Sequence, residues 1–147
     1  MIPESRYIKS EITIRDMAID SSVKLSRESL VRWLALSLGL IGENETRTNI
    51  LPLLDVMIDA HLSGNGLELP DIYNKVNKKV EMDDKTVYYH LGRLKKAGLI
   101  SKKETKYYFG DGFEKDLNMI IENAYRTRID NSFLSVREAI NSLQSRK

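Results

Sequence analysis

Apolar positions along the chain predict a mainly helical protein. Hydrophobic residues between positions 30 and 41 fall on nearly every side of a helix that Ser26 would cap, so this helix must be covered on more than one face. Gly42 is its expected stop. Before it, Ile12 and Ile14 alternate with polar residues as in a strand.

A second helix is expected to begin near residue 48 and to end at the turn formed by residues 63–66. Its apolar side chains have helical spacing, at Ile50, Leu53, Leu54, Met57, Ile58 and Leu62. Residues 67–69 are expected to be extended, because the residue before a proline is pushed out of the helical region. Pro70 then opens a short third helix.

A fourth helix is predicted from Asp83, which is well placed to cap it, to Gly98, which suits a left-handed C-terminal cap. At about 100° per residue, Val87, Leu91 and Leu94 share the side that faces a core. The opposite side is cationic with one aromatic, and it collects Lys85, Tyr89, Gly92, Arg93 and Lys96.

Two β-prone segments, residues 99–103 and 106–109, follow this helix and predict a hairpin. Its tip, Glu104-Thr105, lacks the glycine or asparagine that favours a two-residue turn, so we expect a four-residue or irregular tip. After a break at residues 110–112, an amphipathic helix is traced by Phe113, Leu117, Ile120, Ile121, Ala124 and Tyr125.

The pattern leaves open whether this last segment is one bent helix or two, because residues 130–132 could interrupt it and Ser135 and Glu138 have capping-box spacing. The predicted fold is therefore mainly α with a small β-hairpin. We divide it into an N-terminal extension with an apolar helix (1–47), a central domain (48–110) and a C-terminal helical segment (111–147).

Composition narrows the functional classes. The 147 residues include no cysteine, which excludes a disulfide framework, a thiolate metal site and a cysteine nucleophile. No apolar run approaches the roughly 20 residues of a membrane span, and no signal peptide opens the chain, so we expect a soluble, cytoplasmic protein. The net charge is only +2, but residues 70–110 hold ten Lys or Arg against five Asp or Glu. Positive charge is thus concentrated on the fourth helix and the hairpin.

The order of predicted elements across residues 48–109 resembles a winged helix-turn-helix domain. The run Thr86-Val87-Tyr88-Tyr89-His90-Leu91, continued by Leu94 and by Ala97-Gly98-Leu99-Ile100, is similar to the recognition-helix pattern of ArsR-like transcription regulators of bacteria and archaea. The resemblance implies a recognition helix (about 83–97) in the DNA major groove, a hairpin wing (about 99–109) on the backbone or minor groove, and flanking helices that often make a homodimer. The wing here is short, the cysteines of metal-sensing members are absent, and residues 1–47 match no family pattern.

Basic and aromatic side chains of the fourth helix and hairpin are the candidate nucleic-acid contacts. They are Lys85, Thr86, Tyr88, Tyr89, Arg93, Lys96, Lys102, Lys103 and Lys106. Lysine and arginine suit phosphates and guanine edges, and tyrosine can stack on a sugar or reach a base. The alternative is a lysine-rich face that is merely solvated. For Gly92, close approach of a DNA backbone and tight packing against another helix explain the glycine equally well.

The helices outside the central domain offer more apolar surface than about 60 residues can easily cover. Packing within one chain is one explanation. We prefer that they also build a homodimer, which would place two recognition helices about one DNA turn, roughly 34 Å, apart over a pseudo-palindromic site. The candidate dimerisation residues are Leu30, Trp33, Leu34, Leu117, Ile121 and Tyr125.

Catalysis is not expected, and neither a catalytic residue nor a cofactor is assigned. The sequence has two histidines, His61 and His90, and no cysteine, which are too few ligands for a typical metal site. A structural role at the core boundary is the better explanation of His90, and no metal ligand is assigned. Asp83 and Asp84 point about 100° apart on a helix. The leading hypothesis is a dimeric, sequence-specific regulator that binds double-stranded DNA. The alternative is a winged-helix protein-protein or RNA-associated adaptor that lacks specific duplex binding and docks a protein partner through its helical extensions.

Overall fold

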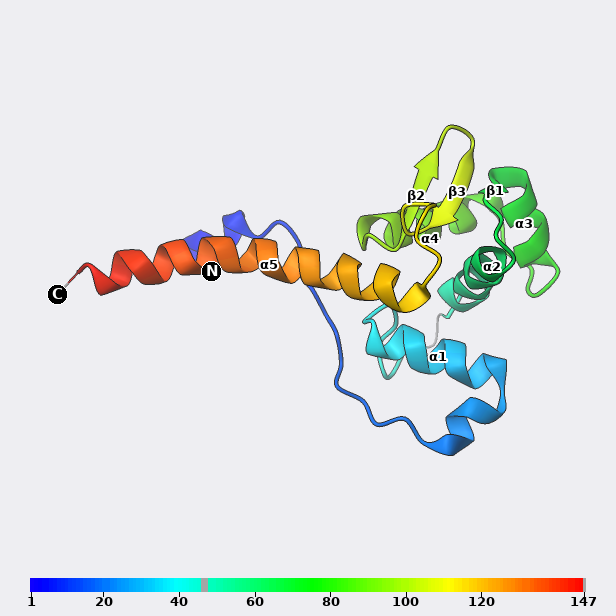
Figure 1. Ribbon diagram of the computed structural model, residues 1–147, viewed down its shortest axis with the longest axis horizontal. Helices are drawn as coiled ribbons and strands as arrows, with labels where there is room; N and C mark the ends of the chain where they lie inside the picture. The colour runs from blue at the N-terminus through cyan, green and yellow to red at the C-terminus, as the bar shows by residue number, and fades with distance from the viewer. Residues whose placement is uncertain (46–47, 147) are drawn as a thin grey trace. The chain divides into compact units, whose positions relative to one another are not determined.

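The computed structural model describes residues 1–45 and 48–146 (Figure 1). The chain is mainly helical with a small amount of β-structure, as the sequence predicts. The predicted hairpin is part of a three-stranded antiparallel sheet. It divides into two compact units, Met1–Glu45 and Thr46–Lys147, which are described separately.

The first unit contains two 3-10 helices, η1 (Pro3–Tyr7) and η2 (Ser21–Leu25), followed by helix α1 (Arg27–Ser37). The Ser26 hydroxyl accepts a hydrogen bond from the Ser29 amide at 3.1 Å, so the predicted cap is confirmed. The predicted stop at Gly42 is wrong, because α1 ends at Ser37 and Gly39 then turns the chain with a φ of +71°. The strand-like pattern at Ile12 and Ile14 forms no strand.

Arg15 fastens the segment between η1 and η2 to the end of α1. Its guanidinium Nη1 donates hydrogen bonds to the carbonyl oxygens of Leu36, at 2.6 Å, and Ile41, at 2.8 Å. Its backbone amide donates to the Ser37 carbonyl at 2.7 Å, and the Ser37 hydroxyl donates to the Arg15 carbonyl at 3.1 Å. A cation at this position lies at the C-terminal end of the helix, where the helix dipole favours positive charge.

The second unit begins with α2 (Ile50–Leu62), β1 (Leu67–Glu68) and α3 (Leu69–Asn77), and continues through α4 (Asp84–Lys96), β2 (Ile100–Lys103), β3 (Lys106–Phe109) and α5 (Leu117–Gln144). The sheet order is β1-β3-β2. Leu67 pairs with Tyr107, Ile100 pairs with Phe109, and Lys103 and Lys106 close the hairpin. The strands thus join the segment after α2 to the segment after α4.

Helix α2 supplies more buried side chains than any other element of this unit, and it packs against α3, α4 and β3. The side chains least exposed to solvent come from all of these elements. They are Ile50, Leu53, Leu54, Met57, Ile72, Val76, Val87, Leu91, Leu94, Leu99 and Phe109. The core set predicted for the fourth helix, Val87, Leu91 and Leu94, is therefore confirmed.

The hairpin tip differs from the prediction. Glu104 and Thr105 form a two-residue turn between Lys103 and Lys106, and the prediction of a four-residue or irregular tip is wrong. Glu104 adopts a φ of 56°, a left-handed conformation that costs a non-glycine residue about 1 kcal/mol. The Thr105 hydroxyl donates to the Glu68 carboxylate at 3.2 Å and thereby ties the tip to the end of β1.

Helix α5 is one continuous helix of 28 residues, which settles the choice between one helix and two. Ser132, in the expected interruption, is helical, and its hydroxyl donates to the Arg128 carbonyl one turn earlier, at 2.9 Å. The helix begins at Leu117, where the Asp116 carboxylate caps it. Phe113, which the sequence placed on this helix, precedes it and is exposed.

The joint between β3 and α5 depends on Gly110. Its φ is +68°, and a Cβ added there would lie 2.9 Å from two side-chain carbons of Ile120. The Asp111 carboxylate accepts hydrogen bonds from the amides of Phe113 and Glu114, at 2.8 and 2.9 Å, and these bonds lower the pKa of Asp111. The His61 Nε2 lies 2.8 Å from the Lys115 carbonyl oxygen, so α2 also holds this joint.

Replacing Gly110 by alanine is expected to destabilise the second unit by about 2 kcal/mol or more, since the change adds an overlap with Ile120 to the left-handed backbone cost. Gly64→Ala is the matched control, because Gly64 has a φ of +77° and nothing within 4 Å of an added Cβ. Urea unfolding should give the control a loss of only about 1 kcal/mol. Equal losses for the two variants would contradict the role given to Ile120.

Candidate nucleic-acid interface

Helix α4 is fixed at its start by a side-chain cap and along one side by the core. The Asp83 carboxylate accepts a hydrogen bond from the Thr86 amide at 2.7 Å. Hydrogen bonds from Thr86 lower the pKa of Asp83, because they favour the charged carboxylate. On the buried side the helix packs against α2, and it leads through Gly98 directly into β2. The opposite side of α4 is thereby held toward solvent.

This outward side carries basic and aromatic residues and one glycine, all of them exposed. They are Lys85, Tyr88, Tyr89, Gly92, Lys95 and Lys96. Tyr88 and Tyr89 are 60% and 64% exposed, unusually high for large aromatic rings that could pack in a core. Lysines on both sides of two open aromatic rings offer charge attraction for phosphates together with a surface on which bases can stack.

Lys95 belongs to this face and was not among the sequence candidates. It lies one turn beyond Gly92 and two turns beyond Tyr88, a spacing of four and then three residues along one helix face. That spacing was the available signal. The projection centred on Lys85 and Tyr89 placed Lys95 at the edge of the arc, where it was passed over.

Thr86 and Arg93 lie at the flank of the outward face and are half-buried. The Arg93 Nη1 lies 3.4 Å from the His90 Nδ1, and the edge of the Tyr89 ring meets the His90 ring with centroids 5.1 Å apart. His90 therefore lies between the core side and the exposed side of α4, in contact with two residues of the candidate set.

The three hairpin lysines are all exposed, and two of them lie over aromatic rings. The Lys102 Nζ is 5.6 Å from the centroid of the Tyr107 ring, and the Lys103 Nζ is 3.8 Å from that of Phe113. Phe113 is 79% exposed, so it serves as an outer support for Lys103 rather than as core. Tyr107 and Phe109 are buried and Tyr108 is half-buried, the alternation expected of side chains along a strand.

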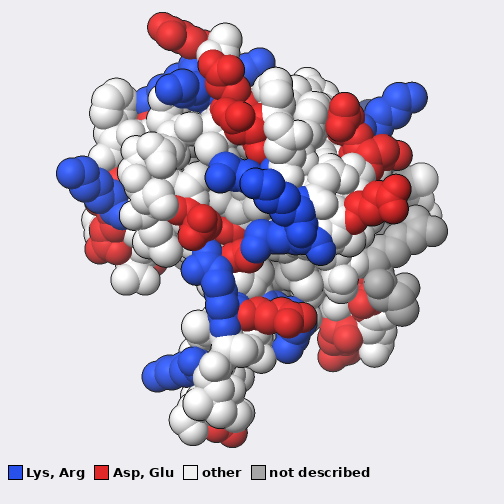
Figure 2. All heavy atoms as spheres, turned by 90° about the vertical axis from the view of Figure 1, so that its right-hand side faces the viewer, with Lys and Arg blue, Asp and Glu red and all other residues white. Residues whose placement is uncertain are grey.

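Charge is not uniform over the surface. The face drawn in Figure 2 shows Lys and Arg side chains interspersed with Asp and Glu, at the top of the view as well as at its centre. The one acidic residue of α4, Asp84, lies in its first turn, and Arg93, Lys95 and Lys96 occupy its last turn. Its cationic character is a local property of this helix and of the hairpin that follows it.

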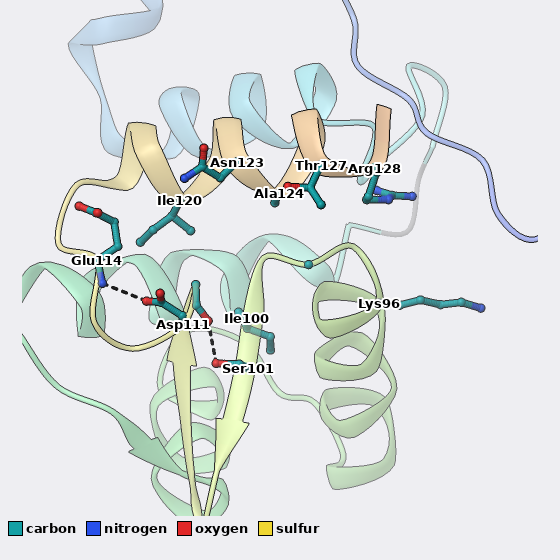
Figure 3. A pocket seen from close by; sticks show the side chains of 12 residues that line it. Lys96, Ile100, Ser101, Asp111, Glu114, Ile120, Asn123, Ala124, Thr127 and Arg128 are labelled. Atoms are coloured by element: carbon teal, nitrogen blue, oxygen red, sulfur yellow. Dashed lines mark hydrogen bonds between the residues drawn. The ribbon is translucent and has the colours of Figure 1, made fainter. Parts of the chain in front are cut away.

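A hollow of about 570 Å³ lies between the base of the hairpin and the first half of α5 (Figure 3). Ile120 points into it from α5, whereas the Lys96 side chain points away from it. The Ser101 hydroxyl donates to the Gly110 carbonyl at 2.7 Å, and Asp111 binds the Glu114 amide, so the hydrogen bonds drawn there hold the turn between β3 and α5.

The candidate dimerisation residues have different environments. In the first unit Leu30 is 38% exposed, while Trp33 and Leu34 are half-buried and the Trp33 indole donates to the Ala18 carbonyl at 2.9 Å. In the second unit Leu117 and Ile121 are half-buried. Tyr125 is buried, which raises the pKa of its hydroxyl. The dimer itself stays a prediction.

Two further features of the described residues concern metal binding and membrane insertion. Across residues 1–45 and 48–146, no three His, Asp or Glu side chains are grouped so as to hold a metal ion. In the same part of the chain, none of the helices combines the length and the apolarity that crossing a membrane requires.

The Asp83 cap gives a pH-dependent prediction. Because the pKa of Asp83 is lowered in the folded chain, its contribution is present above the ordinary carboxyl pKa and is lost as pH falls through the folded value. Asp83→Asn keeps an accepting oxygen but no charge, so its thermal midpoint should lie below that of the wild type at pH 7 and approach it at low pH. The thermal midpoint of Asp83→Ala should lie about 2–5 °C below that of the wild type at pH 7.

Thermal unfolding followed by circular dichroism between pH 2.5 and 7 makes this comparison. Asp71→Asn, in the first turn of α3 where no side chain caps the helix, is the control and should change the midpoint little. A constant difference between wild type and Asp83→Asn across this pH range would contradict the charged cap.

In comparisons with known proteins, no family model, no curated protein and no solved structure matches this chain.

Proposed function

We propose that the protein is a sequence-specific, DNA-binding transcriptional regulator of the winged helix-turn-helix kind, acting as a homodimer in the cytoplasm. The observation that carries the proposal is the exposed face of α4, where lysines lie on both sides of two open tyrosine rings, continued by the lysines of the hairpin. In this proposal α3 and α4 form the helix-turn-helix, α4 is the recognition helix, and the β2–β3 hairpin is the wing.

Binding would place the outward face of α4 in the major groove. Lys85, Lys95 and Lys96 would contact phosphates or guanine edges, and Tyr88 and Tyr89 would lie against sugars or bases. Arg93, held beside His90, would contribute from the flank of this face. The positive charge of the helix would supply most of the affinity for DNA. The tyrosines, and the lysines that reach guanine edges, would supply the selectivity between DNA sequences.

Gly92 supports a close approach. A Cβ added at this position meets nothing within 4 Å, so packing against another helix of the chain does not account for a glycine in the middle of α4. Mid-helix glycine costs about 1 kcal/mol relative to alanine. A DNA backbone that passes close to the helix at this point would give a reason for keeping it.

The wing would lie along the adjacent backbone with Lys102, Lys103 and Lys106. The tight two-residue tip and its tie to Glu68 keep the wing short and stiff, and Phe113 supports Lys103 from below. In a homodimer, two such units would bind half-sites separated by one DNA turn, roughly 34 Å, or a multiple of it.

The second candidate is a winged-helix adaptor that contacts a protein or RNA without specific duplex binding. The exposed apolar side chains of α5, among them Phe133 and Leu143, favour some protein contact. An adaptor predicts that selection from a random duplex library enriches no sequence, and that affinity purification recovers a stable complex with a different protein.

Charge reversal on α4 tests the DNA-binding proposal. DNA selected by the purified protein should bind the Lys85→Glu, Lys96→Glu double variant at least about 100-fold more weakly than the wild type, because two phosphate contacts become repulsive. The control is Lys9→Glu with Lys24→Glu, which makes the same change in net charge at exposed positions of the first unit and should bind normally.

Mobility-shift titrations at several salt concentrations measure both variants. Wild-type affinity should fall steeply with salt, and the double variant on α4 should show a shallower slope. Equal binding by the wild type and the α4 variant would overturn the assignment of this face.

Gly92→Ala separates stability from binding. Because the added methyl group meets open space, the variant should unfold with a free energy about 0.5–1 kcal/mol higher than the wild type. On the selected DNA it should bind more weakly, because the methyl group enters the space left for the DNA backbone. A variant that is stabilised and binds as well as the wild type would exclude the close approach at Gly92.

A further inference from the structure

The second half of α5 is a helix without a covering. Every described residue from 130 to 146 is exposed, although this segment carries five large apolar side chains. In Figure 1 the red end of α5 has no helix or strand of its own unit beside it. A helix in water derives most of its stability from packing an apolar face, so this one calls for a partner.

The apolar residues of this half form a narrow, regular stripe. Together with the half-buried Ile129 just before them, they follow each other along the helix at alternating intervals of four and three residues: Ile129, Phe133, Val136, Ile140 and Leu143. This is the a/d pattern of a coiled-coil seam, which is narrower than the face by which a helix packs on a globular core. Leu134 alone lies off the stripe.

The residues beside the seam indicate which partner fits it. Phe133 and Ile140 take the a positions, and Ile129, Val136 and Leu143 take the d positions. The flanking e positions then hold Asp130 and Arg137, and the flanking g positions hold the small residues Ser132 and Ala139. One flank is charged with both signs, and the other permits close approach of a second helix.

These charges are complementary in one arrangement of two identical helices. When the helices run antiparallel, e faces e, and Asp130 of each copy meets Arg137 of the other, which gives two opposite-charge pairs by symmetry. The same register sets Phe133 against the second copy's Val136 and Ile129 against its Ile140. In a parallel pair, e faces g, so Arg137 would meet Ser132 and no opposite charges would pair.

We propose that the second half of α5 pairs with a second copy of this chain as a short antiparallel coiled coil. This deepens the proposed function, because it rests on the proposed homodimer and names its contact surface. The surface differs from the candidates Leu117, Ile121 and Tyr125, which are at least half-buried. The two DNA-binding units would lie at opposite ends of the paired helices, so the length of α5 would set the half-site spacing.

The first test is the mass of the full-length protein in solution, since one chain is 16.9 kDa. Sedimentation equilibrium over roughly 1–200 µM should show a dimer. Val136→Asp places a carboxylate in the seam of each copy and should raise the dissociation constant at least about 100-fold. Leu134→Asp is the matched control, because it puts the same charge on the same helix off the seam, and it should remain dimeric.

The second test determines the relative orientation of the two helices by disulfide cross-linking. The chain has no native cysteine, so only introduced cysteines can form the disulfide. In the antiparallel pair, positions 129 and 140 of different copies face each other, whereas two copies of position 140 lie about 16 Å apart along the axis. Ile129→Cys with Ile140→Cys should therefore form a covalent dimer on oxidation, and Ile140→Cys alone should not. The single variant would cross-link only in a parallel pair.

The charge pairs give a third arm. Asp130→Arg should weaken the dimer roughly fivefold, and the swap Asp130→Arg with Arg137→Asp should restore it. A wild-type monomer, a dimer indifferent to Val136→Asp, or cross-linking by Ile140→Cys alone would each overturn the proposal. Because these arms measure mass and not DNA binding, the dimer and the DNA-binding proposal can fail separately.

Discussion

The burial of α2 is the constraint on which the second unit depends. Its side chains are apolar on almost every side, and all of them except those of Asp59 and Leu62 are buried or half-buried. A helix of this kind needs neighbours around its whole circumference. Helices α3 and α4 and strand β3 provide them, and α4 meets this need with Val87, Leu91 and Leu94. The other face of α4, with the lysines and the open tyrosines, takes no part in the core. The core contacts and the candidate interface therefore lie on opposite faces of one helix.

Local chemistry explains which features of this fold could be predicted. Asp83, Gly98 and the apolar positions of α4 act within one or two turns of the chain, so cap, stop and core side could all be inferred from residue type and spacing. The division of α4 into two faces followed from the same spacing. Lys95 was missed because an angular projection has no sharp edge, and only measured exposure decides where the open face ends.

Features set by distant contacts escaped sequence reasoning. Helix α1 ends at Ser37, where Gly39 adopts a left-handed backbone and the amides of Gly39 and Leu40 donate to the carbonyls of Leu36 and Ala35. Arg15, from a segment without regular structure, adds hydrogen bonds to the carbonyls of Leu36 and Ile41. The hairpin closes in two residues although Glu104 must adopt a left-handed backbone, and a contact from Thr105 to β1 accompanies it. In each case a hydrogen bond from elsewhere in the chain accompanies the local turn, and no periodicity in the sequence indicates such a bond.

Helix α5 shows how one continuous element can serve two surfaces. Its first half turns Ile120 and Tyr125 inward, and Ile120 meets the backbone at Gly110, which fixes the direction of the helix relative to the sheet. Between residues 130 and 146 no side chain is buried, and the apolar positions change to the narrower a/d spacing. Because the helix is continuous through Ser132, the direction set at Gly110 is carried to the exposed stripe. A second chain bound there would therefore be held at a defined position relative to α4, which is the geometry that a pair of half-sites on DNA requires.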